Sequence, residues 1–130
     1  MNATELRRTV ELPWATARER VIEALSAEGF GVLSEIDVQA TLKKKIDVDM
    51  PKYAILGACN PPLAHQAISA LPDIGVMLPC NVIVYEEDDH TVIAAVDPRA
   101  TIASIAGPAE LRTIADDVRA RLVRVLESVS

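Results

Sequence analysis

The chain contains two cysteines, and an asparagine directly follows each of them. Cys59-Asn60 lies within the stretch ACNPP, and Cys80-Asn81 lies within PCN. Thiolate is a soft ligand that selects zinc or monovalent copper, and an activated thiol can serve as a nucleophile or a redox group. The repeated Cys-Asn pair therefore makes these two motifs the first candidates for a chemical site.

His65 could complete such a site, because it lies just over one turn into the helix expected after Cys59. Two thiolates and an imidazole, supplied by Cys59, Cys80 and His65, would suit zinc or copper. The amides of Asn60 and Asn81 could donate hydrogen bonds to the oxygens of a small ligand. Alternatively, Cys59 could act as a nucleophile or redox thiol with His65 as its base, since the N-terminus of the following helix would lower the thiol pKa.

A packing role competes with both of these interpretations. Cysteine is among the most frequently buried residue types and commonly behaves as a small hydrophobic residue. Asn60 suits the N-cap of a helix, and Pro61 suits its first position. Asn81 could form a turn before its own strand. The residues alone therefore leave open whether the protein is an enzyme, a binding module or a purely structural or interaction protein.

Two long helices are expected, one within residues 14–30 and one at about 109–128. In the first, Thr16 and Glu19 have the spacing of a capping box, and Gly29 suits the position just past the helix end, where a positive φ is favoured. In the second, apolar residues recur at steps of three and four, which is typical of a helix with one buried face. These residues are Leu111, Ile114, Val118, Leu122, Val125 and Val129.

Five strands are expected between and around these helices. Their ranges are 4–12, 30–38, 52–58, 80–87 and 91–97. The last two form a hairpin around a short acidic turn. A third helix begins after Asn60, short helical segments are expected at 40–48 and 99–105, and the residues after Leu71 are expected to form a loop.

This order of elements predicts a single α+β domain over residues 1–130. Its mostly antiparallel sheet has the order β-α-β(4)-α, with small helical insertions and two long helices as its cover. If strands 52–58 and 80–87 are antiparallel neighbours, Cys59 at the end of one approaches Cys80 at the start of the other. The two Cys-Asn motifs would then lie side by side at one end of the sheet.

Charge and composition exclude several classes of function. The chain carries 19 acidic and 13 basic side chains, for a net charge of −6, whereas a nucleic-acid binder needs a concentrated basic face. No signal-peptide core and no membrane span are found in the sequence. We therefore expect a cytoplasmic protein with no nucleic-acid or membrane partner, whose cysteines stay reduced.

Three stretches carry a resemblance to a known family: GFGVLSEID, YAILGACNPPLAHQA and LPCNVIVYE. They closely resemble the bacterial and archaeal domain-of-unknown-function family numbered 302, over roughly residues 1–105. The resemblance implies a TATA-binding-protein-like α+β fold and a homodimer, and it implies no established activity. Seven candidate residues fall inside its motifs: Cys59, Asn60, Pro61, His65, Pro79, Cys80 and Asn81.

We therefore favour a small dimeric module that binds a small molecule or a soft metal near the two cysteines. The ligand candidates are Cys59, Asn60, His65, Cys80 and Asn81, and zinc or copper is the metal that this set would hold. A thiol-dependent enzyme or redox protein that uses Cys59 with His65 is the alternative. A purely structural or interaction protein is the second alternative.

Overall fold

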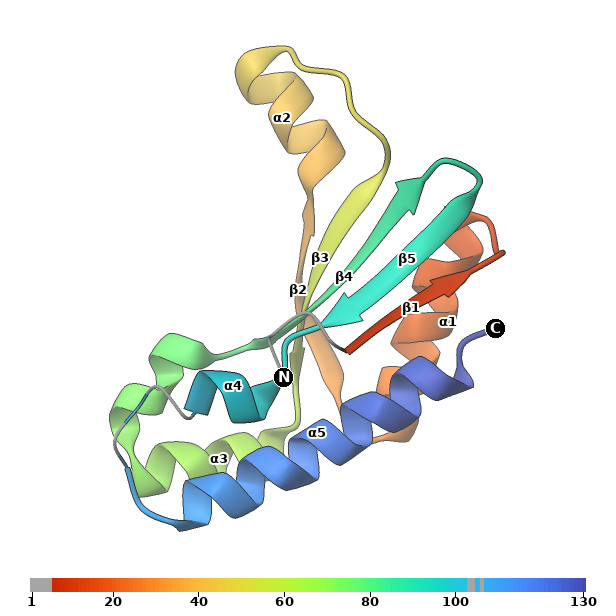
Figure 1. Ribbon diagram of the computed structural model, residues 1–130. Helices are drawn as coiled ribbons and strands as arrows, with labels where there is room; N and C mark the ends of the chain where they lie inside the picture. The colour runs from red at the N-terminus through yellow and green to blue at the C-terminus, as the bar shows by residue number, and fades with distance from the viewer. Residues whose placement is uncertain (1–5, 103–104, 106) are drawn as a thin grey trace.

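The computed structural model describes residues 6–102, 105 and 107–130. It forms one five-stranded antiparallel sheet with the strand order β1-β5-β4-β3-β2, together with helices (Figure 1). The elements are β1 (Leu6–Val10), α1 (Trp14–Ala27), β2 (Gly31–Asp37), α2 (Val38–Ile46), β3 (Tyr53–Cys59), α3 (Pro61–Ala70), a 3-10 helix (Pro72–Met77), β4 (Cys80–Glu87), β5 (His90–Ala95), α4 (Pro98–Ile102) and α5 (Glu110–Ser128). The predicted α+β class and element order are confirmed.

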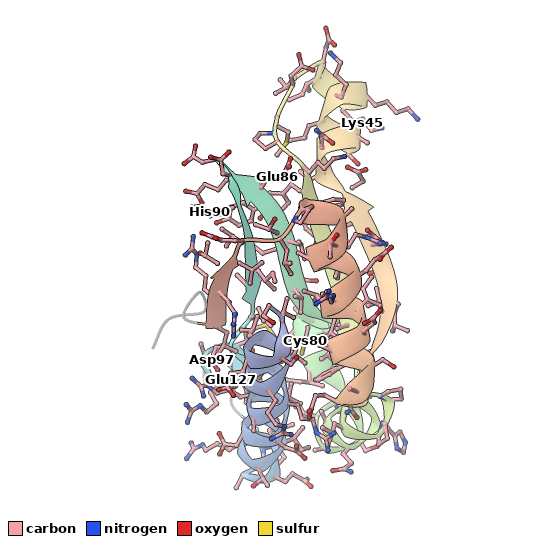
Figure 2. All side chains as sticks on the ribbon, turned by 90° about the vertical axis from the view of Figure 1, so that its right-hand side faces the viewer. Lys45, Cys80, Glu86, His90, Asp97 and Glu127 are labelled. Atoms are coloured by element: carbon pink, nitrogen blue, oxygen red, sulfur yellow. The ribbon has the colours of Figure 1, made fainter. Side chains whose placement is uncertain are left out.

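The two long helices, α1 and α5, cover one face of the sheet (Figure 2). Alternate residues of the central strands point toward them, among them Leu56 and Val84, which are fully buried. Val21 and Leu25 of α1 and Leu122 of α5 meet these strands with no exposed surface. Each such side chain contributes roughly 1.5–3 kcal/mol through burial, so this aliphatic layer is the main source of stability.

Helix α1 begins earlier than the capping-box spacing suggested, and that prediction is wrong. Pro13 precedes the helix, no side chain caps it, and Thr16 already lies inside it. Proline restricts the backbone to a conformation suited to a helix start, and its carbonyl accepts a hydrogen bond from Ala17 N at 2.9 Å. The end of the helix follows the prediction, since Gly29 has a φ of 86°.

The short segments also differ in detail from the sequence prediction. Helix α2 begins at Val38 because the carboxylate of Asp37 accepts a hydrogen bond from Ala40 N at 2.9 Å and caps it. The segment expected to be a loop forms the 3-10 helix instead, since Pro72 suits its first turn and Ile74 is buried under it. The predicted helical turn at 99–105 appears as α4, and residues 103 and 104 lie outside the described residues.

None of the helices in the described ranges has the length and apolar character needed to cross a membrane. This agrees with the amphipathic pattern of α5, whose buried residues recur every three or four positions and whose other side is charged.

Candidate functional site

The ends of β3 and β4 bring the two Cys-Asn motifs together. The strands pair antiparallel, with Ala58 opposite Cys80 and Gly57 opposite Asn81. Cys59 therefore lies one position beyond the pairing partner of Cys80, at the same end of the sheet. The two strands thus meet the condition under which the sequence placed Cys59 near Cys80. Helix α3 leaves β3 at this point, so the site stands where a strand ends and a helix begins.

A small pocket opens beside these two motifs and encloses about 60 Å³. The end of β3, helices α3, α4 and α5, the 3-10 helix and the start of β4 all contribute to it. No lining residue is charged, and most are aliphatic. The lining residues include Phe30, Cys59, Asn60, Leu63, Ala64, Ile74, Pro79, Cys80, Ile114 and Val118.

Cys80 contributes a neutral thiol to this pocket. Its side chain is mostly buried, and both cysteines are free. The pKa of the Cys80 thiol is raised to about 11, mainly by burial and to a smaller extent by the nearby Cys59. At neutral pH Cys80 therefore acts as a small, nearly apolar part of the wall, because a thiolate is disfavoured in this environment.

This pKa shift predicts a loss of stability at alkaline pH. The unfolded thiol has a pKa of 9.0 and the folded one about 11, so the folded state holds the proton more tightly. The resulting stabilisation is complete below pH 9 and is lost as the pH rises through 11. Chemical unfolding at pH 8 and pH 11 should show that the wild type loses about 2 kcal/mol more than Cys80→Ala does. Equal losses in the two proteins would show that Cys80 titrates normally in the fold.

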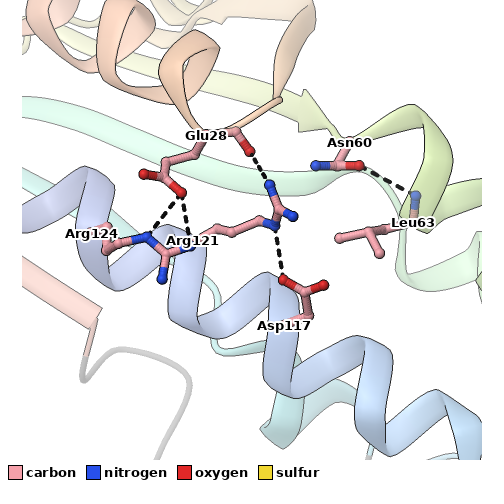
Figure 3. A network of polar contacts seen from close by, with 6 residues as sticks. All are labelled: Glu28, Asn60, Leu63, Asp117, Arg121 and Arg124. Carbon is pink, nitrogen blue, oxygen red and sulfur yellow. Dashed lines mark hydrogen bonds and ion pairs between the residues drawn. The ribbon is translucent and has the colours of Figure 1, made fainter.

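Asn60 has the structural task expected of it. Its Oδ1 accepts a hydrogen bond from Leu63 N at 3.3 Å and caps α3, while Pro61 takes the first helical position (Figure 3). Asn60 is only 8% exposed, and a Cβ added at Gly29 would lie 3.0 Å from its Nδ2. The cap of α3 therefore lies close to the end of α1.

A polar network next to Asn60 holds α1 and α5 together. Arg121 donates through Nη1 to the carbonyl of Glu28 at 2.8 Å and through Nε to Asp117 at 2.8 Å (Figure 3). Arg124 hydrogen bonds the Glu28 carboxylate at 3.0 Å and lowers the pKa of that carboxyl group. Because α5 also supplies Ile114 and Val118 to the pocket, this network fixes the position of one pocket wall.

The structure separates His65 and Asn81 from the pocket. Both side chains are exposed, and neither lines it. In the part of the chain that the structure describes, no hydrogen bond joins His65 to Cys59, and no three His, Cys, Asp or Glu side chains gather where they could hold a metal ion. Of the five candidate residues, Cys59, Asn60 and Cys80 lie together, whereas Cys59, Cys80 and His65 do not form a three-ligand set.

Most of the pocket was not identified from the sequence. Phe30, Ile74, Ile114 and Val118 come from three separate segments and have the apolar character of ordinary core residues. The apolar stripe of α5 was the available signal for Ile114 and Val118, and it predicts burial without distinguishing a solid core from a cavity. Only the assembled fold places these residues around a shared space.

Comparison with known proteins identifies relatives of this chain. The model of the family described as domain of unknown function DUF302 matches residues 6–129, so the match extends past residue 105 and includes α5. The crystal structure of an uncharacterized conserved protein DUF302 from Bacillus stearothermophilus is 30% identical, covers 97% of this chain and 99% of its own, and superposes with a TM-score of 0.87. No curated protein matches the chain.

Proposed function

The chain belongs to the family described as domain of unknown function DUF302, and within that family we propose that it is a non-catalytic module that binds a small, uncharged, mainly apolar molecule in the pocket beside Cys59 and Cys80. The observation that carries this proposal is the pocket lining, which combines aliphatic side chains with a neutral thiol and one buried amide. Small-molecule sites have this character, being concave and mostly apolar with few polar groups.

The size of the cavity limits the ligand. Its volume of about 60 Å³ is less than half of the roughly 150 Å³ that accommodates benzene in an apolar cavity. The ligand is therefore a molecule of a few heavy atoms, or the end of a short aliphatic chain. A charged group would lose its hydration without gaining an opposite charge, because no lining residue is ionised.

The same observations weigh against the thiol enzyme and the soft-metal site. The enzyme interpretation paired Cys59 with His65 as its base, and His65 is exposed and does not line the pocket. A zinc site would need more ligands than the two cysteines supply among the described residues, and burial favours the protonated form of Cys80 over the thiolate that copper would bind. No observation favours the thiol enzyme or the soft-metal site over the binding of a small molecule.

Xenon and short alcohols can test the proposed binding. We expect xenon under pressure, and 1-propanol, to shift the methyl NMR signals of Leu63, Ile74 and Ile114. Propionate should produce at least about tenfold weaker binding than 1-propanol, because its charge would be buried unpaired. The measurement is a methyl chemical-shift titration of the full chain.

Two variants on α3 form the matched comparison. Ala64→Leu places extra volume on a residue that lines the pocket, and it should abolish these shifts. Gln66→Leu places a similar side chain on an exposed position of the same helix and should leave them intact. Absence of shifts in the wild type, or equal shifts in Ala64→Leu, would overturn the proposal.

A further inference from the structure

A second, larger cavity lies next to the pocket beside Cys59 and Cys80, which we call the inner pocket. It encloses about 510 Å³, within the range of roughly 300–1,000 Å³ that is typical of small-molecule sites. Helix α4, the start of α5 and the residues before α5 form its walls, and α4 packs beside α5 (Figure 1). Ile102 and Ala115 line both spaces, so the two are neighbours with a shared wall. We call the larger space the outer cavity, and its lining is Arg99, Ile102, Ile105, residues 107–109, Leu111, Arg112 and Ala115.

The floor of the outer cavity is aliphatic. Leu111 and Ala115 of α5 are buried, and Ile102 and Ile105 are half-buried against the core. Gly107 lies close to this floor, since an added Cβ there would be 2.6 Å from Cδ1 of Leu111. Among the described residues that line the cavity, only the two arginines have polar side chains. A ligand in this cavity therefore meets apolar surface and two guanidinium groups.

The charges at the outer cavity leave one positive charge in excess. Arg112 is exposed and makes no ion pair with any residue that the structure describes. Arg99 Nε lies 3.7 Å from Asp116 Oδ1, and both side chains are at least half exposed, so this ion pair is weak. Glu110, in the first turn of α5, is exposed and does not line the cavity. Two guanidinium groups against one carboxylate thus leave a positive charge beside the apolar floor.

We propose that the outer cavity binds an aliphatic monocarboxylate of medium length, with Arg112 and Arg99 holding the carboxylate and the floor holding the chain. A guanidinium group binds a carboxylate through two parallel hydrogen bonds, and a single negative charge balances the excess at this site. The cavity is about three times the roughly 150 Å³ that accommodates benzene, which leaves room for a chain of about eight to ten carbons. This charged ligand differs from the uncharged one proposed for the inner pocket, so the two sites are independent of each other.

A series of ligands tests the outer cavity in the unchanged protein. Calorimetric titration of the full chain should show octanoate binding at least about tenfold more tightly than 1-octanol, which lacks the charge, because hydrogen bonds to charged groups are the stronger ones. From butanoate to octanoate, each two added carbons should raise the affinity by about tenfold, since each CH₂ group leaves water for the apolar floor. Acetate, which has the charge without the chain, should bind most weakly.

Methyl NMR signals locate the bound octanoate. Leu111 and Ile105 line only the outer cavity, whereas Leu63 and Ile74 line only the inner pocket. We expect octanoate to shift the methyl signals of Leu111 and Ile105.

Two variants with the same change in net charge form the matched comparison. Arg112→Gln removes the unpaired guanidinium group and should weaken octanoate binding by at least about tenfold while leaving 1-octanol binding unchanged. Its far-ultraviolet circular dichroism spectrum should match that of the wild type, because the side chain is exposed. Lys44→Gln removes an exposed cation from α2, at the opposite end of the molecule from the start of α5 (Figure 1), and should bind octanoate as the wild type does.

A third variant separates the two sites. Ala64→Leu adds volume to the inner pocket alone, so it should leave octanoate binding and the Leu111 shift intact even where it abolishes binding in the inner pocket. Equal affinities for octanoate and acetate would overturn the proposal for the outer cavity. Equal octanoate binding by Arg112→Gln and the wild type, or octanoate shifts confined to Leu63 and Ile74, would overturn it too.

Discussion

Asp97→Ala should lower the free energy of unfolding by about 3 kcal/mol, the low end for removing one partner of a buried ion pair. The side chain of Asp97 is 1% exposed, and its Oδ2 accepts a hydrogen bond from Arg119 Nε at 3.3 Å. Its Oδ1 accepts a second one from Arg99 N at 3.0 Å, which caps α4. The substitution removes both interactions, and with them the ion pair that links the segment after β5 to α5. Denaturant unfolding at neutral pH measures the loss.

Two variants locate the source of this effect. Asp97→Asn keeps the cap on α4 but removes the charge, so it should cost about half as much as the alanine substitution. Asp116→Ala removes an ion pair to Arg99 in which both side chains are at least 50% exposed. Such a pair is worth under about 1 kcal/mol, so Asp116→Ala should have little effect. A loss for Asp97→Ala no larger than that of Asp116→Ala would contradict a stabilising role for the buried carboxylate.

Gly57→Val should destabilise the fold by about 3 kcal/mol, the upper end for overpacking a site that is already filled. Gly57 lies in β3, between β4 and β2 in the sheet, and is buried. A Cβ at this position would collide with Ser34 Oγ and would lie 2.9 Å from Cγ of Pro79. Ser34 belongs to β2 and Pro79 directly precedes β4, so the Ser34 hydroxyl would have to turn away and the Pro79 ring, which is fixed to its backbone, would have to shift. Thermal and denaturant unfolding measure the cost.

Gly31→Val is the matched control for this substitution. Gly31 lies in β2 of the same sheet, and an added Cβ there would meet no atom within 4 Å. Valine suits an extended strand, so the control should change stability by less than about 1 kcal/mol. If Gly57→Val and Gly31→Val cost the same, the absence of space at Gly57 would not be the reason for a glycine at this position.

The pocket walls connect these stability predictions to the proposed function. Pro79 lines the pocket and also packs on Gly57, and Cys80 follows it in β4. Asn60 both caps α3 and lines the pocket, and it lies so near Gly29 that a Cβ added there would come within 3.0 Å of its Nδ2. Pro79, Cys80 and Asn60, which resemble a chemical motif in the sequence, are thus structural residues at the start of β4 and the start of α3. The space between them is what remains available to a ligand.

The fold could be predicted from the sequence because its signals are local. The apolar steps from Leu111 to Val125 determine the buried face of α5, and Asn60-Pro61 marks the start of α3 regardless of what surrounds it. Where local signals competed, the prediction failed. Thr16 and Glu19 have the spacing of a capping box, yet Pro13 starts α1 one turn earlier. Ile74 converts an expected loop into a 3-10 helix because burying its side chain requires a compact turn.

The candidate site depended on contacts that no local pattern contains. The sequence by itself determined the α+β class and the cap at Asn60, since helix and strand signals suffice for these, whereas it placed Cys59 near Cys80 only on the condition that their strands pair antiparallel, which the structure fulfils. Only the tertiary structure decided that His65 is exposed and that Cys80 is held as a neutral thiol. It also decided that Phe30, Ile74 and Val118 enclose a cavity together with Cys59 and Cys80. The physical reason is that burial and its effect on a thiol pKa depend on how distant segments pack, and those distances are set when the helices close over the sheet.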